Sequence, residues 1–516
     1  MRALRNLGWP AYLLCLAAGS LYMADSSWTS VTQYRSDYVF ERDFEAGPAI
    51  GSDVVIVVLD GLRTDAVAGL PAFERLAKAG ASGSMRVTVP SLSNPARAAF
   101  VTGTWPEVSG VTNNSTFESV PVQSLFGLAD RRGLRSSVFG SRFWPRAFGE
   151  SVERGSPAAR YSSYAVSELV RWQSQYCDEA LTHLADSDAA IRVVDLQAGD
   201  EAGHTYGGAS DAYREVIASV DDCLGRIADQ LGPHVTLVAL SDHGHIHRRG
   251  RGGHGGLEPE VLYAPFVLAG PGVRHATQID AEIVDIAPTV SALLGLPIPA
   301  NSQGMVLWEA LDVPAEHDAD LKQLEQEQRT ALQAHMPDRA ASLRAQRSER
   351  LPSAILIGCC LVAGAFGSVY GQRQRVRALL ISSACFVLGY FALFYAFGVG
   401  YSISSIVRQE YLYAFLAKDV AAAAVAFGVA ALVLFRLVGR RSGTAIRLAA
   451  LIGSVAAMLV AWTHFEHGLL MDRWMVALGP VFQAYLHMVA IVGVVLGIFL
   501  VVVLNRLIPS SRESAQ

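Results

Sequence analysis

Six acidic and imidazole side chains stand in four short motifs of the chain, and all six are of types that bind divalent metal ions. The motifs are VVLDGLRTD with Asp60, GDEAGH with Asp200 and His204, SDHGH with Asp242 and His243, and GGHGG with His254. Carboxylates and imidazoles suit zinc and similar ions, and two ions about 4 Å apart can stabilise the attacking and leaving oxygens of an ester. We therefore expect two divalent ions, with Zn²⁺ favoured and Mn²⁺ as the alternative.

Ser93 is a candidate nucleophile. It lies in SLSNPARAAF, where Pro95 suits the first position of a helix and Asn94 its cap. The N–H groups and positive end of such a helix favour phosphate or sulfate oxygens. A serine hydroxyl alone is a weak nucleophile, but coordination to a divalent ion would lower its pKa enough for attack.

Each of these residues also has a purely structural explanation when it is taken singly. Asp60 could cap a turn, His243 could be a buried core histidine, and His254 could lie at a loop tip. The joint pattern is more specific than any one member and favours chemistry on a charged ester.

The elements that must position these residues form an alternating series. Apolar runs of strand length at 53–60, 136–140, 191–196, 234–241 and 264–270 are separated by helical patterns. This alternation predicts an α/β sandwich with a mainly parallel sheet, which we call the α/β domain (residues 25–313). Asp60, Asp200 and Asp242 come at or just after strand ends, where open α/β sheets bind ligands. Residues 141–190 are expected to form either a substrate cap over that edge or an ordinary surface excursion.

Apolar residues make up 51% of the 516 residues and are unevenly spread. Residues 1–24 are interpreted as a membrane anchor or a cleavable signal peptide, of which we favour the anchor. Residues 314–350 are charged and predict a solvated helical linker. Residues 351–516 predict a transmembrane domain of about five helices, because apolar runs of spanning length lie at 353–370, 379–398, 419–438, 446–462 and 482–504.

Six alternating spans would place the arginines of the short loops on one side of a membrane. These are Arg2 and Arg5, then Arg373, Arg375 and Arg377, then Arg440, Arg441 and Arg447, then Arg506 and Arg512. Because positive loops stay cytoplasmic, both termini are expected there and residues 25–350 in a periplasm or secretory lumen. Lys418 and Asp419, at a span edge, are either headgroup contacts or interface anchors.

Cysteines and net charge limit the function further. Cys177 and Cys223 fall in the α/β domain, where an oxidising compartment would allow a disulfide, but the sequence leaves their pairing open. The net charge of −5 and the lack of a basic patch argue against binding to nucleic-acid polymers.

The four motifs together with SNPARAAFVTGTWPEVSGVTNN resemble the alkaline phosphatase superfamily of two-metal enzymes that transfer phospho and sulfo groups. The resemblance covers about residues 50–300 and implies an alkaline-phosphatase-like sandwich. It implies that one ion is held by Asp60, Asp242, His243 and the oxygen of Ser93. It implies that Asp200, His204 and His254 hold the other.

The segment TGTWPEVSGVTNN is similar to the nucleotide pyrophosphatase and type I phosphodiesterase branch, in which its last asparagine contacts phosphate. Asn114 stands at that place, although it could also be half of an Asn-Asn turn. The order of anchor, motif-bearing domain and several spans resembles the GPI ethanolamine phosphate transferases, whose C-terminal parts are usually longer. These likenesses imply a phosphodiesterase or phosphotransferase that forms a phosphoserine on Ser93. Its expected partners are a phosphodiester or lipid-linked substrate, with phosphoethanolamine-type transfer favoured, and membrane lipids.

Two alternatives stay open. The letters SNPAR fit the sulfatase pattern in which Cys or Ser is oxidised to formylglycine, although Cys is usual in this proline-containing form. The lysines and histidines that normally surround a sulfate are not seen. Arg97 of the same motif either contacts the anionic substrate or holds the turn through a carboxylate. The minor alternative is a non-catalytic pseudoenzyme that serves as a receptor.

Overall fold

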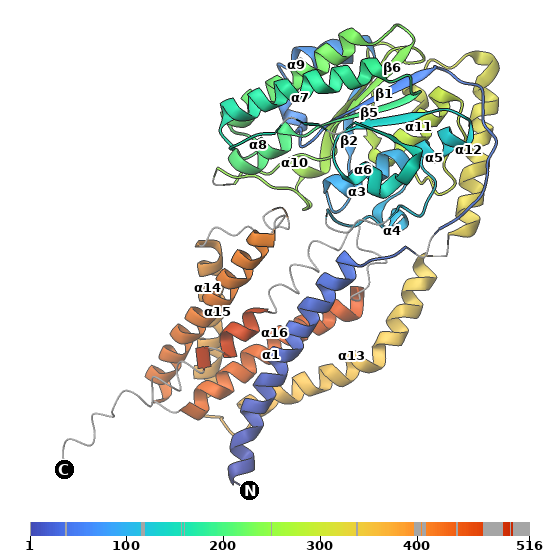
Figure 1. Cartoon of the computed structure of the whole chain (residues 1–516). Helices are drawn as coiled ribbons and strands as arrows, with labels where there is room; N and C mark the ends of the chain where they lie inside the picture. Colours follow the sequence, from blue (N-terminus) through green and yellow to red (C-terminus); the bar gives the residue numbers. More distant parts are fainter. Residues whose placement is uncertain are drawn as a thin grey trace, which may run out of the picture. The chain divides into compact units, whose positions relative to one another are not determined.

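The computed structural model describes residues 2–36, 39–114, 119–155, 157–158, 160–248, 250–336, 339–396, 404, 409–439, 442–467, 489–495 and 497–498. The chain divides into two compact units. One is the α/β domain, which runs from Thr32 to Arg339 and also includes Trp474–Val476. The other, here called the helical unit, contains the N-terminal helix and the remainder of the C-terminal part of the chain (Figure 1).

A nine-stranded sheet forms the centre of the α/β domain, in the order β4-β3-β5-β1-β6-β7-β2-β8, with β9 paired to β2. The strands are β1 Asp53–Leu59, β2 Ala81–Arg86, β3 Ser136–Phe139, β4 Glu153–Gly155, β5 Ile191–Leu196, β6 Val235–Leu240, β7 Tyr263–Ala269, β8 Thr277–Gln278 and β9 Ala281–Glu282. The five strands from β4 to β6 are parallel, whereas β7 is antiparallel to both of its neighbours. The predicted mainly parallel α/β sandwich is thus confirmed, and each of the five predicted strands is present.

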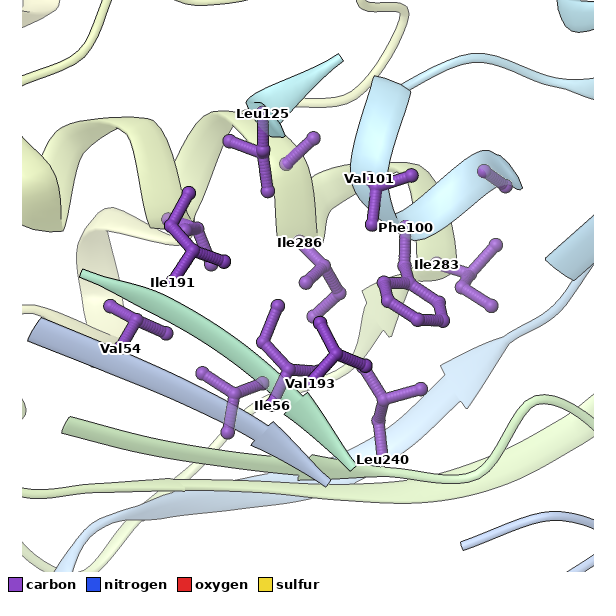
Figure 2. Packing of buried hydrophobic residues seen from close by; sticks show 14 of the residues in the cluster. Val54, Ile56, Phe100, Val101, Leu125, Ile191, Val193, Leu240, Ile283 and Ile286 are labelled. Atoms are coloured by element: carbon purple, nitrogen blue, oxygen red, sulfur yellow. The ribbon is translucent and has the colours of Figure 1, made fainter. Parts of the chain in front are cut away.

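The central strands are buried on both faces, which explains their continuous apolar runs. Successive side chains of a strand point to opposite faces, so β1 contributes to two cores. Figure 2 shows one of them, where Val54 and Ile56 of β1 approach α3, α5 and α11. On the other face, Val55 and Val57 join a core with α2, α7, α8 and α9.

The helices of the α/β domain follow the strands in chain order. They are α2 Pro71–Ala79, α3 Ser93–Thr102, α4 Pro106–Ser109, α5 Leu125–Arg131, α6 Phe143–Phe148, α7 Val166–Asp186, α8 Ala198–Tyr206, α9 Asp211–Gln230, α10 Pro259–Leu262, α11 Ile286–Leu294 and α12 Ala315–His335, with single 3₁₀ turns at Thr64–Ala66, Gly149–Ser151, Ile283–Asp285 and Trp308–Ala310. A disulfide between Cys177 and Cys223 joins α7 to α9. The pairing that the sequence left open is therefore formed.

Residues 141–190 contain two helices that pack into the two cores. Trp144 of α6 is 1% exposed and lies in the core that contains α3. Leu169 and Tyr176 of α7 are buried in the core that contains α9. These helices therefore cover the faces of the sheet, and a cap formed by this segment stays a prediction.

The charged segment 314–350 is helical, as expected, but it is not solvated throughout. Helix α12 buries Leu321, Glu325, Gln328 and Leu332. The Glu325 carboxylate accepts hydrogen bonds from the Val306 N–H at 2.7 Å and from the Trp308 indole at 2.7 Å. A fully solvated linker would lack such contacts, so α12 is part of the α/β domain.

The helical unit contains α1 Arg2–Thr32, α13 Arg339–Val369, α14 Val376–Ala396, α15 Gln409–Val438 and α16 Ser442–His467. Among the described residues, three segments are long and apolar enough to cross a membrane: Arg347–Val369, Val376–Ala396 and Leu412–Val438. Gly443–Leu459 is a shorter apolar helix. Most of the predicted span 482–504 lies outside the described residues, as do Arg440, Arg441, Arg506 and Arg512. The count of six spans and the orientation stay predictions.

Asp419 lies within the third of these segments rather than at its edge. Its carboxylate is fully buried and accepts a hydrogen bond from the Tyr390 hydroxyl of α14, whereas the neighbouring Lys418 is exposed. Asp419 therefore links α14 to α15, and the headgroup contact predicted for this pair stays untested.

Candidate metal centre and its nucleophile

Three neighbouring parallel strands deliver the carboxylates to one edge of the sheet. Strand β1 ends at Leu59 and is followed by Asp60, and β6 ends at Leu240, two residues before Asp242. Strand β5 ends at Leu196 and leads into α8, which carries Asp200. Because β5, β1 and β6 are parallel neighbours, their carboxyl ends lie side by side. The expected convergence of distant motifs follows from this topology.

Asp60, Asp242 and His243 form one group with metal-ligand geometry. The His243 Nε2 atom lies 3.5 Å from Asp60 Oδ1 and 3.7 Å from Asp242 Oδ2. The other ring nitrogen, Nδ1, lies 3.2 Å from the Gly244 carbonyl oxygen. A proton on Nδ1 can be donated to that carbonyl, which leaves the Nε2 lone pair facing the two carboxylates, as in a metal-binding histidine.

The two carboxylate oxygens that face His243 are buried and have no hydrogen-bond partner among the described residues. They are Oδ1 of Asp60 and Oδ2 of Asp242. Burial and the charges of Asp242 and Asp200 raise the pKa of Asp60 well above its ordinary value, and burial also raises the pKa of Asp242. Burial lowers the pKa of His243, which favours the neutral, ligating imidazole. A divalent cation would offset both sets of costs, so these residues fit a metal ion.

A second group consists of Asp200, His204, His245 and His254. Asp200 and His204 are four residues apart on α8, so they share one face of the helix. The Nε2 atoms of His204 and His254 lie 3.4 Å and 3.3 Å from Asp200 Oδ1. Burial favours a higher pKa for Asp200, but the charge of His204 and hydrogen bonds from His245 and His254 hold it well below the ordinary value.

His254 is held in a defined orientation by the loop that precedes α3. Its Nδ1 atom lies 2.8 Å from the Ser91 carbonyl oxygen, so Nε2 can carry the lone pair that faces Asp200. Its ring also stacks on that of His243, with centroids 3.6 Å apart and an angle of 11° between the planes. The two groups are therefore adjacent, as a two-ion site requires.

Ser93 is the first residue of α3 and is buried. Its Oγ atom lies 3.1 Å from His243 Nε2, so it faces the group of Asp60. The helix begins two residues earlier than predicted: Leu92 is the N-cap and Pro95 is the third helical residue. The expectation that Asn94 caps the helix is wrong, because Asn94 is itself helical and its side chain bonds elsewhere.

Asn114 is tied to the start of α3. Its Oδ1 atom accepts a hydrogen bond from the Asn94 N–H at 3.0 Å, and its carbonyl oxygen accepts one from the Asn94 side-chain amide at 3.2 Å. Asn114 is exposed, and its amide nitrogen is the donor that a phosphate on Ser93 would require. Its role in binding stays a prediction.

Arg97 is buried and bonded to two carboxylates. Its Nη2 atom donates to Asp60 Oδ2 at 2.7 Å and to Asp195 Oδ1 at 2.9 Å. This geometry corresponds to the second interpretation of Arg97, a contact that orients a carboxylate. Direct contact between Arg97 and substrate stays untested.

Sequence reasoning missed two residues of this region. His245 follows His243 by two positions in SDHGH, and a third histidine beside the metal motif was a usable signal. Asp195 lies in β5, where a charged residue inside a buried apolar strand was another. Asp195 also accepts from the Trp144 indole at 3.3 Å, so it connects the hydrophobic core to the site.

Residues 54–251 match the family model described as "Type I phosphodiesterase / nucleotide pyrophosphatase". The α/β domain therefore contains a type I phosphodiesterase/nucleotide pyrophosphatase domain. The match begins at β1 and includes Asp60, Ser93, Asp200 and Asp242, but ends before His254.

Among curated proteins, the chain is similar to the catalytic subunit of GPI ethanolamine phosphate transferase 2 from Homo sapiens. The two are 26% identical over 288 residues, which is 51% of this chain and 28% of the human protein. The chain thus spans less than a third of that relative's length. GPI ethanolamine phosphate transferase 1 from Homo sapiens is 24% identical over 302 residues, with 49% of this chain and 32% of that protein covered.

Among solved structures, the chain is similar to murine ectonucleotide pyrophosphatase/phosphodiesterase 5. The TM-score is 0.40 with 16% identity, over 48% of this chain and 96% of the murine protein.

Proposed function

We propose that the protein is a membrane-bound, two-metal phosphodiesterase or phosphotransferase with Ser93 as its nucleophile. The observation that carries the proposal is the position of Ser93 Oγ, 3.1 Å from His243 Nε2 and beside the partnerless oxygens of Asp60 and Asp242. A nucleophile at that point is surrounded by the groups that would hold a divalent ion. The matched phosphodiesterase family supports the same reaction class.

In the first step, Ser93 Oγ attacks phosphorus and loses its proton to solvent. The Oγ–P bond forms, the bond from phosphorus to the leaving alcohol breaks, and that alcohol gains a proton. In the second step, water or another alcohol attacks the phosphoserine and releases Ser93. Ions held by Asp60, Asp242 and His243 and by Asp200, His204 and His254 would lower the pKa of the nucleophile and neutralise charge on the phosphate.

Protein groups contribute to the same steps. The N–H groups at the start of α3 and the positive end of that helix stabilise negative oxygens on the transferring group. The Asn114 amide nitrogen donates to one of those oxygens. Arg97 acts at a distance from substrate, since it orients Asp60 through a 2.7 Å hydrogen bond.

A lipid-linked substrate is the favoured version of this function. Three apolar helices of spanning length are more than anchoring needs, and the named relatives are ethanolamine phosphate transferases. We infer transfer of a phosphoethanolamine-type group to or from a lipid. Comparison of lipid extracts from cells that express the natural protein or Ser93→Ala tests this inference, because the substituted protein should leave the donor lipid unconsumed.

The reaction class is tested on purified full-length protein in detergent with Zn²⁺ or Mn²⁺. A chromogenic phosphodiester should be cleaved and an aryl sulfate left intact, and Ser93→Ala should lower kcat/KM by about 10³-fold or more. The exposed Ser163→Ala is the matched control and should retain activity. Cleavage of the sulfate alone would contradict the proposal.

The sulfatase alternative rests on the sequence SNPAR and is decided by mass spectrometry of the peptide that contains Ser93. Formylglycine would appear as the loss of two hydrogens from the serine, whereas our mechanism requires an unmodified serine that becomes phosphorylated during turnover. A pseudoenzyme would bind no metal and cleave neither substrate, so metal analysis of the same preparation separates the third reading.

A further inference from the structure

We propose that His245 is a fourth ligand in the Asp200 metal site, so that Asp200, His204, His245 and His254 enclose one ion. The superfamily resemblance assigns only three of these residues to that ion. The inference rests on the proposed function, because it concerns the same two-metal centre, and it specifies how the two ions differ.

The first support is the position of the His245 ring. Its side chain is fully buried, and Nε2 lies 3.0 Å from Asp200 Oδ1, the oxygen that the Nε2 atoms of His204 and His254 also approach. All four ligand atoms lie within 4.8 Å of one another. The Nδ1 atom has no hydrogen-bond partner among the described residues, so Nε2 is the nitrogen through which His245 meets polar groups.

The separations among these atoms suit tetrahedral coordination. Ligand atoms about 2.0–2.1 Å from a tetrahedral zinc ion stand about 3.3–3.4 Å apart. The three distances from Asp200 Oδ1 are 3.0, 3.3 and 3.4 Å, and the Nε2 atoms of His204 and His254 are 3.1 Å apart. A small contraction of this kind is expected for side chains that hydrogen-bond to one another and would separate slightly around an ion.

The second support is the space that three glycines leave for the imidazole. A Cβ atom on Gly61 would stand 2.8 Å from His245 Nε2, and one on Gly203 would stand 2.3 Å from its Cδ2. A Cβ on Gly208 would stand 2.8 Å from the His245 Cβ. Any larger residue at these positions would push the ring away, so the backbone around the site is shaped to admit it.

A fourth protein ligand would make the two sites chemically unequal. Three imidazoles and one carboxylate favour zinc over magnesium, since nitrogen donors suit borderline ions. The group of Asp60, Asp242 and His243 offers one imidazole and two carboxylates besides the Ser93 oxygen. The Asp200 site is therefore the tighter of the two, and its ion has four protein donors before any substrate binds.

Zinc binding to the full-length protein in detergent tests the proposal without a substrate. The protein is stripped with a chelator and titrated with Zn²⁺ against a chromophoric competitor, and bound zinc is counted by mass spectrometry. Loss of a hydrogen-bonding residue near a ligand typically weakens metal binding by about 10–100-fold. We expect His245→Ala to weaken the tighter of the two ions by more than about 100-fold and to leave the other unchanged.

His247→Ala is the matched control, because His247 is exposed and two residues away in the same loop. It should bind both ions as the natural protein does. Added imidazole should restore much of the affinity that His245→Ala loses. Unchanged affinity in His245→Ala, or a loss below about 10-fold, would overturn the proposal. For an intermediate loss, a Co²⁺ absorption spectrum decides: a changed spectrum supports ligation and an unchanged one overturns it.

X-ray absorption of the natural protein gives a test that does not depend on a variant folding. With one equivalent of Zn²⁺ bound, the tighter ion should show three imidazoles, and two would contradict the proposal. Failure to cleave a phosphodiester would refute the proposed function while these metal measurements still stood.

Discussion

Arg97 is expected to stabilise the α/β domain because it neutralises two buried carboxylates at once. Its Nη2 atom lies 2.7 Å from Asp60 Oδ2 and 2.9 Å from Asp195 Oδ1, and the three side chains are 5%, 5% and 0% exposed. The substitution Arg97→Met keeps the length of the side chain and removes its charge. Both carboxylates would then be stranded in a buried environment.

The size of the effect follows from the cost of breaking a buried ion pair, which is about 3–5 kcal/mol when one partner is removed. Unfolding entropy near 2.1 cal/mol/K per residue converts this into a fall in Tm of about 5–8 °C for a domain of roughly 300 residues. The measurement is thermal unfolding of the full-length protein in a chelator, so that no metal ion compensates the charge of Asp60. Arg97→Lys keeps the charge with fewer donors and should show a smaller fall.

A double substitution tests the assigned contact. Arg97→Met with Asp195→Leu removes one of the stranded carboxylates, so the combined loss should be smaller than the sum of the single losses by about 1–3 kcal/mol. Additivity within about 0.5 kcal/mol would refute the reasoning. A loss below about 1 kcal/mol for Arg97→Met would refute it as well, since a buried pair should cost several-fold more.

Three further predictions concern other parts of the α/β domain. Replacing Cys177 and Cys223 by alanine opens a link across 46 residues and should lower the free energy of unfolding by up to about 4 kcal/mol, as measured by denaturant unfolding with and without reductant. Burial raises the pKa of Asp285 to about 6, so its contribution to stability is present below pH 4 and is lost as pH rises through 6. Asp285→Asn should therefore lose less stability than the natural protein between those pH values, and equal pH profiles would contradict this. Gly203→Ala places a Cβ 2.3 Å from the His245 ring, so it should weaken zinc binding without loss of the folded circular dichroism spectrum.

Much of the fold could be predicted because local pattern and burial agree in the central strands. The runs around β1, β5 and β6 are continuous and apolar, as strands buried on both faces require. Strand β2, with the sequence ASGSMR, and the two-residue strands β8 and β9 gave no such signal. These strands are formed by pairing with distant neighbours, and pairing partners are a tertiary property.

The packing of α12 shows the same limit in a helix. Its charged composition predicted a solvated segment, yet Gln328 donates to the carbonyl oxygens of Pro299, Ala300 and Ser302. A single polar residue that satisfies three backbone groups is invisible in composition. The contact depends on the path of residues 299–302, which the sequence does not specify locally.

The sequence by itself determined the types of the metal-binding groups and the sheet edge at which they meet. Asp60 and Asp242 follow apolar runs that can only be buried strands, and parallel neighbours bring their carboxyl ends together. The tertiary structure alone decided which other side chains join them. His245 enters the Asp200 group because three glycines leave room for its ring, and Asp195 reaches Asp60 through Arg97. Such contacts depend on distances of about 3 Å between segments far apart in the chain, and only the packed core fixes distances to that precision.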